Sequence, residues 1–149
     1  MDFAEQLRVA RLAAGLTQVQ LATRAGTSQS RLSSYENGAV TPNRSTKVRL
    51  LRATRIRPSQ IIEEMRDQIL EIAKINGLRN VRVFGSIARR EDTVKSDIDL
   101  LVTPGPKSSL FDIAAFLGGV RGATGFDVDV ISDRSLSKDS ELSRMAMAL

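Results

Sequence analysis

Hydrophobic residues recur at helical spacing over the first third of the chain, and no strand pattern interrupts them. The first such stretch places apolar side chains at Phe3, Leu7, Ala10 and Ala14. Short helices are predicted over residues 3–14, 17–25, 28–36 and 44–53, and a longer one over 58–76. Thr17 and Ser28 are suited to cap helix N-termini, whereas Gly15 and Gly26 suit the turns. The pattern predicts an all-helical domain over residues 1–62, with a boundary near Ile62–Met65.

The periodicity then changes from helical to alternating. Strands are predicted around Val81 and Val83, over Asp97–Val102 and over Phe126–Ile131, with helices over residues 108–120 and 138–147. Strands that alternate with helices are typical of a single sheet covered by helices. The predicted fold class is therefore α+β with two domains: an all-α bundle over residues 1–62 and a small α/β domain with a mixed sheet over residues 63–149.

The chain contains neither cysteine nor histidine, which narrows its chemistry. Disulfides, thiolate nucleophiles, Ser-His-Asp triads and imidazole zinc sites are excluded. Any catalysis must depend on carboxylates, basic side chains, hydroxyls and a hard cation. No apolar run is long enough to cross a bilayer and no leader pattern is present, so a cytoplasmic protein without membrane contact is expected.

The charge is unevenly divided between the two halves. Residues 1–62 contain ten basic and three acidic side chains, whereas residues 63–149 contain twelve basic and fourteen acidic ones. A basic half joined to a mildly acidic half favours nucleic acid as the partner of the first half. Arg-rich helices with solvated faces would give the same asymmetry, so charge alone does not decide.

The segment LTQVQLATRAGTSQSRLSSYENG resembles the helix-turn-helix of Xre/Cro-like phage repressors, which implies a lambda-repressor-like bundle that binds operator DNA, usually as a dimer. Gln29 and Ser30, at the start of the third helix, are the best candidates for base contacts. The other candidates for DNA contact are Ser28, Arg31 and Ser34 on that helix, and Gln18, Asn37 and Arg44, for which the resemblance implies phosphate contacts.

Two carboxylates interrupt an apolar strand in the second half. Asp97 and Asp99 alternate with Ile98 and Leu100, so both aspartates point to one face of the sheet. Carboxylates this close repel each other unless one takes up a proton or a cation joins them. Oxygen ligands suit a hard divalent cation, and Mg²⁺ is the obvious choice.

Gly85 and Ser86 follow the first predicted strand and open a short helix. Glycine lets a ligand approach the backbone closely, while the serine hydroxyl and the exposed amides can hold an anion such as a triphosphate. Arg89, one turn further on, would add positive charge. A phosphate cradle beside a carboxylate pair predicts a site for a nucleoside triphosphate.

Gly85-Ser86, ten residues and then Asp97-Ile98-Asp99 match the signature of polymerase-beta-like nucleotidyltransferases. The form GSIARR…SDIDLLV is similar to the minimal nucleotidyltransferases in particular. The resemblance implies a third carboxylate on a neighbouring strand; Asp127 and Asp129 both qualify, and Val-Asp followed by two apolar residues favours Asp129. It also implies that Asp97, Asp99 and Asp129 hold Mg²⁺ and catalyse in-line attack on the α-phosphate of ATP.

Minimal nucleotidyltransferases resemble antitoxins that adenylylate HEPN-type RNase toxins, so the resemblance implies a HEPN-like toxin as partner, in a homodimer or a larger hetero-oligomer. About 85 residues leave little room for an acceptor-binding domain, and a fused DNA reader suits an antitoxin that represses its own operon. Two alternatives stay open. One is a regulator whose second domain only binds nucleotide or a partner, and the other is an enzyme that modifies a small molecule.

Overall fold

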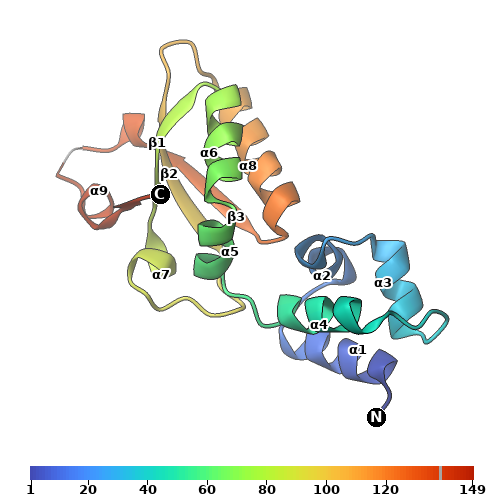
Figure 1. The fold of residues 1–149 in the computed structure, drawn as a ribbon. Coiled ribbons are helices and arrows are strands. Elements are labelled where there is room, and N and C mark those ends of the chain that lie inside the picture. Colours follow the sequence, from blue (N-terminus) through green and yellow to red (C-terminus); the bar gives the residue numbers. More distant parts are fainter. Residues whose placement is uncertain (138) are drawn as a thin grey trace.

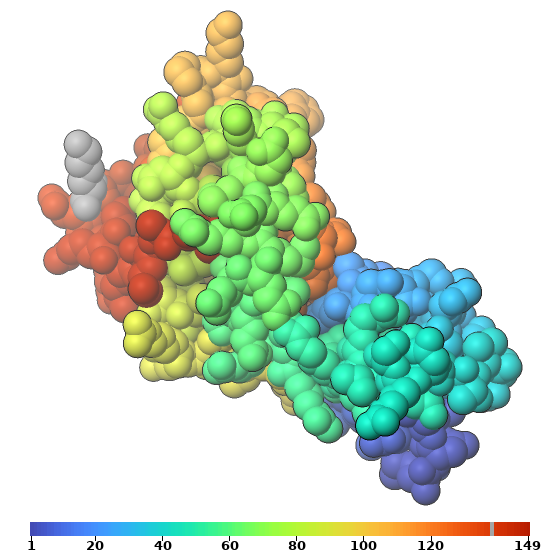
Figure 2. Space-filling view, viewed as in Figure 1, coloured from blue at the N-terminus to red at the C-terminus, as the bar shows by residue number. Residues whose placement is uncertain are grey.

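The computed structural model describes residues 1–137 and 139–149 and consists of two lobes in contact (Figures 1 and 2). A helical lobe, coloured blue to teal, lies against one end of a larger lobe that contains the sheet. The predicted fold class is confirmed: a helical region is followed by an α/β domain with a mixed sheet. Within the described residues, no helix has the length and apolar character needed to cross a membrane.

The helical lobe is built from four short capped helices, α1 (Phe3–Ala13), α2 (Gln18–Ala25), α3 (Gln29–Glu36) and α4 (Arg44–Ala53). Thr17 and Gln20 form a capping box at α2, and the Ser28 side chain accepts a hydrogen bond from the Arg31 amide at α3. Gly26 ends α2 with φ of 68°, a left-handed conformation that glycine adopts at little cost. Leu7, Leu21 and Leu32 belong to a separate core between these helices.

The prediction of a single helix over residues 58–76 is wrong, because the helix is interrupted at Met65. The segment forms α5 (Pro58–Glu64) and α6 (Arg66–Ile75), and Met65 between them has φ of −108° and ψ of 15°. The interruption changes the direction of the helix axis, and Ile61 and Ile62 of α5 and Ile69 of α6 are all buried in the core of the larger lobe. Helical periodicity continues through Met65, so the sequence pattern gives no sign of the break.

The sheet has four strands in the order β3-β2-β1-β4. They are β1 (Leu78–Val83), β2 (Ile98–Pro104), β3 (Val128–Ser132) and β4 (Met147–Ala148). β1 is antiparallel to both β2 and β4, whereas β2 and β3 are parallel and are joined by α8 (Leu110–Thr124). β2 starts one residue after the predicted start, so Asp97 lies just before the strand and Asp99 lies on it.

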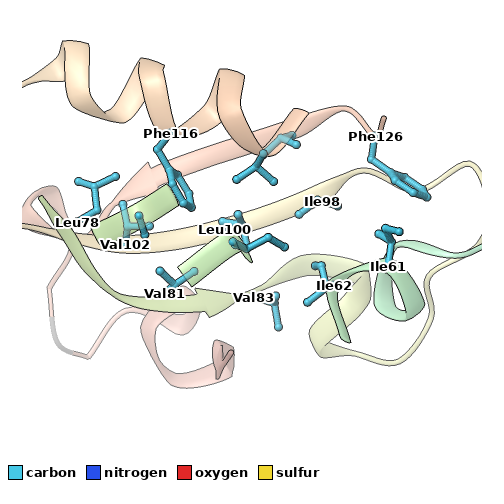
Figure 3. Packing of buried hydrophobic residues seen from close by; sticks show 14 of the residues in the cluster. Ile61, Ile62, Leu78, Val81, Val83, Ile98, Leu100, Val102, Phe116 and Phe126 are labelled. Atoms are coloured by element: carbon cyan, nitrogen blue, oxygen red, sulfur yellow. The ribbon is translucent and has the colours of Figure 1, made fainter. Parts of the chain in front are cut away.

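One face of the sheet is buried beneath α6 and α8 (Figure 1). Ile98, Leu100 and Val102 alternate along β2 and point into this core, where Phe116 of α8 packs over them and Phe126 lies beside Ile98 (Figure 3). Because side chains alternate along a strand, the apolar half of β2 holds the sheet against the helices and Asp99 points to the opposite face.

The last predicted helix, over residues 138–147, is wrong in extent; Lys138 lies outside the described residues. The structure has a 3-10 turn at Asp133–Ser135, a short helix α9 (Glu141–Met145), and then β4, which pairs Met147 with Val83 of β1. The open edge of β1 offers unpaired backbone groups, and satisfying them favours a strand over a continued helix.

Candidate functional site

The carboxylates meet where β2 and β3 run side by side. Asp99 and Asp129 are register partners in the parallel pair, so their side chains lie on the same face of the sheet. Asp97 and Asp127 immediately precede the two strands, where the Ile98 amide donates to the Asp127 carbonyl at 2.9 Å. Parallel pairing therefore brings together two Asp-x-Asp segments that are far apart in the chain.

Burial and the closeness of these carboxylates raise the pKa values of Asp97 and Asp99. Burial raises the pKa of Asp97 above its ordinary value, and the charges of Asp127 and Asp129 raise it further. Burial also raises the pKa of Asp99, as do Asp129 and Asp97, while the nearby Arg89 guanidinium opposes the shift. Mutual repulsion of this kind is relieved by a bound cation or a shared proton.

The segment after β1 lies against Asp99. Gly85 opens α7 (Gly85–Ala88) with φ of 65°, and a Cβ at this position would overlap the Asp99 carboxylate. The Phe84 amide donates to the Asp99 carbonyl at 3.0 Å, which fixes this segment beside β2. Ser86 follows on α7 and is partly exposed, as a ligand-binding hydroxyl would need to be. Glycine is thus required here by a close approach and by a left-handed backbone.

A hollow of about 530 Å³ opens beside α7. Gly85 and Arg89 line one side, and Leu142 and Met145 of α9 line the other. Arg89 is exposed and hydrogen bonded to Glu91 at 3.0 Å. No sequence motif includes the α9 side chains, because only the fold of the C-terminal segment brings them to the Gly-Ser turn.

The side chains of the site include oxygen donors suited to a hard cation. Within the part of the chain that the structure describes, no three acidic side chains are grouped as ligands of one metal ion. The available donors are carboxylate oxygens, the ligand type that Mg²⁺ and similar cations prefer. The residues present therefore fit a divalent cation by the chemistry of their donor atoms.

The predicted DNA-contact residues lie on the helical lobe, and three consecutive ones are exposed. Gln29, Ser30 and Arg31 are exposed at the start of α3. Four further predicted residues lie nearby. The Ser28 side chain caps α3, and Ser34 is partly buried and donates to the Ser30 carbonyl at 3.1 Å. The Asn37 side-chain oxygen accepts from the Ala39 amide, and Arg44 is exposed at the start of α4. The exposure of Gln29, Ser30 and Arg31 is compatible with the predicted contacts to bases, which stay a prediction.

Gln18 has a structural partner that the sequence did not reveal. Its side-chain nitrogen donates to Glu36 at 3.0 Å, and Arg11 donates to the same carboxylate at 2.6 and 3.1 Å. Burial would raise the pKa of Glu36, but the hydrogen bonds from Arg11 and Gln18 hold it below its ordinary value. This buried network ties α1, α2 and α3 together.

Comparison with known proteins agrees with this geometry. Residues 2–61 match the helix-turn-helix domain family, and residues 62–143 match the nucleotidyltransferase domain family. A protein of Methanocaldococcus jannaschii, provisionally named a protein adenylyltransferase, is 35% identical over 75 residues, which are 50% of this chain and 81% of the relative.

A solved structure provisionally described as a minimal nucleotidyltransferase is 33% identical. It superposes with a TM-score of 0.56 over 61% of this chain and 95% of its own. The chain belongs to the nucleotidyltransferase domain family and has a helix-turn-helix domain, a DNA-binding fold, on the N-terminal side of its nucleotidyltransferase domain.

Proposed function

We propose that this protein transfers AMP from ATP to a hydroxyl group of another protein, with Mg²⁺ as its cation, and that its helix-turn-helix domain binds operator DNA. The observation that supports the enzymatic part best is the pairing of Asp99 with Asp129 beside the Gly85–Ser86 turn. The provisional name of the archaeal relative points to the same reaction class.

Each side chain of the site has a role in this proposal. Asp97 and Asp99 would hold Mg²⁺, which neutralises charge on the triphosphate when bound. The Gly85 and Ser86 amides and the Ser86 hydroxyl bind the β- and γ-phosphates, Arg89 adds positive charge, and the hollow beside α9 accommodates the nucleoside. Asp129, whose charge acts on both Asp97 and Asp99, is the third carboxylate.

The chemical step is an in-line displacement. Asp129 accepts the proton of the acceptor hydroxyl, and the hydroxyl oxygen forms a bond to the α-phosphorus. The bond between that phosphorus and the oxygen bridging to the β-phosphate breaks, and pyrophosphate leaves. Asp127 also acts on Asp97 by its charge, but it lies 4.0 Å from Arg121 and faces the helical lobe, which supports a place for it at the rim.

The acceptor in this proposal is a HEPN-type RNase toxin, and the chain is its antitoxin and a repressor of their shared operon in the cytoplasm. The support is the resemblance of GSIARR…SDIDLLV to minimal nucleotidyltransferases and the compact domain over residues 63–149, which leaves the acceptor to dock from outside. The DNA-reading domain over residues 1–62 would bind as a dimer, alone or with the toxin.

The test uses α-labelled ATP, Mg²⁺, this protein and the product of the adjacent gene. Label should move to the partner protein, and Asp97→Asn with Asp99→Asn should abolish the transfer. Asp112→Asn is a matched control, because Asp112 caps α8 away from the carboxylates. A stable complex with partner or DNA but no transfer would favour the regulator that only binds. Transfer to a small molecule alone would favour the other alternative.

A further inference from the structure

Arg24 of α2, in the helix-turn-helix domain, enters the junction between the two lobes. Its Nε donates to the Gly125 carbonyl at 3.1 Å, and its Nη1 lies 3.5 Å from the Val94 carbonyl. The guanidinium also stacks on the buried Phe126 ring, 3.4 Å from its centroid. One planar group therefore holds two segments of the nucleotidyltransferase domain at once.

Those two segments are the ones that lead into the carboxylates. Val94 lies three residues before Asp97, and Gly125 lies two residues before Asp127. Beyond them the Ile98 amide and the Asp127 carbonyl form the first hydrogen bond between the two segments. Arg24 is thus a bridge just outside the point where β2 and β3 begin to pair.

The rest of the junction fits the same contact. Val94 packs against the hydrophobic core of the helical lobe, although it belongs to the loop that leads to β2. Gly125, with φ of 74°, lets α2 approach closely, since a Cβ there would lie 2.8 Å from Arg24 Cγ and 3.0 Å from the Gln20 carbonyl. A small hollow of about 180 Å³ separates α2 from Asp97 and Asp127.

We propose that Arg24 is a positioning residue of the nucleotidyltransferase site: by bridging the Val94 and Gly125 carbonyls, it makes the helix-turn-helix domain set the spacing between Asp97/Asp99 and Asp127/Asp129. This inference rests on the proposed function for the carboxylates. Arg24 lies outside residues 62–143, which match the nucleotidyltransferase domain family, so the bridge is an addition of this chain to the family's own elements.

The physical basis is the sensitivity of metal sites to the residues that orient their ligands. Removing such an outer partner typically weakens metal affinity about 10- to 100-fold. A positive charge alone cannot replace Arg24, because one side chain has to contact the Gly125 carbonyl, the Val94 carbonyl and the face of the Phe126 ring. A lysine has a single point charge and cannot reproduce the planar fork.

The first measurement is the affinity for Mn²⁺, used as a paramagnetic stand-in for Mg²⁺, with α,β-methylene-ATP present. Arg24→Ala should weaken Mn²⁺ binding about tenfold, and Arg24→Lys should restore little of it. Gly125→Ala, which displaces α2 from the opposite side, should act in the same direction. Arg49→Ala is the matched control, because Arg49 is exposed on α4 and its removal should leave the affinity unchanged.

A second measurement needs neither metal nor nucleotide. Hydrogen exchange of the Ile98 amide should become faster in Arg24→Ala but not in Arg49→Ala, with circular dichroism showing that both are folded. Unchanged Mn²⁺ affinity and unchanged Ile98 exchange in Arg24→Ala would overturn the positioning role. Full recovery by Arg24→Lys would also overturn it, because charge alone would then suffice.

The proposed function fails in a different way. Wild-type protein that binds no Mn²⁺ with the nucleotide, or an Asp97→Asn variant that binds it as well as wild type, would remove the metal site itself. The exchange of Ile98 would still decide whether Arg24 holds the two segments together.

Discussion

Gly85 gives the sharpest test of the geometry, because one methyl group there affects both backbone and site. An alanine at φ of 65° costs about 1–2 kcal/mol relative to glycine. Its Cβ would overlap the Asp99 carboxylate and lie 3.3 Å from Asp99 Cγ. Asp99 must then move by on the order of 1 Å, a displacement that can cost about 100-fold in rate.

Two assays separate these effects. Urea unfolding of Gly85→Ala should show a loss of about 1–2 kcal/mol. The transfer of labelled AMP should fall about 100-fold under conditions where the variant is folded. Gly118→Ala is the matched control: Gly118 is exposed on α8 and an added Cβ there meets nothing within 4 Å, so the change should stabilise by about 0.5–1 kcal/mol without changing transfer. Wild-type transfer by Gly85→Ala would refute the placement of Gly85 against the carboxylate.

Three further predictions follow from the same contacts. Because the pKa of Asp99 is raised in the folded protein, its protonated form stabilises the fold at pH values below the ordinary pKa of 3.8, and this stability is lost as the pH rises through the raised pKa. The metal-free Asp99→Asn variant should therefore have a higher melting temperature than wild type at neutral pH, and the difference should vanish near pH 3. Glu36→Ala should destabilise the helical lobe by about 3 kcal/mol, because it strands the Arg11 charge in a buried network; unchanged urea unfolding would contradict this. Arg31→Ala should weaken binding to a mixed-sequence duplex and reduce the slope of log K against log salt by about 0.9 if Arg31 meets a phosphate, whereas an unchanged affinity would place it outside the interface.

Local signals in the sequence determined much of the fold. Thr17 and Ser28 cap the helices where the pattern placed them, because a hydroxyl at an N-cap acts on neighbouring amides. The alternation of Asp97, Ile98 and Asp99 predicted one polar and one apolar face of β2, since side-chain direction along a strand has a period of two. These features depend only on residues within a few positions of one another.

Other features required the tertiary structure. The break at Met65 and the replacement of a C-terminal helix by β4 arise from packing and from an open sheet edge, which overrule local periodicity. Asp129 becomes the partner of Asp99 only through the parallel register of β2 and β3. The bridge formed by Arg24 joins carbonyls 70 and 101 residues away, a separation that no pattern along the chain encodes. The sequence by itself thus determined which chemical groups are present and which face each occupies, whereas their distances were decided by how distant segments pack.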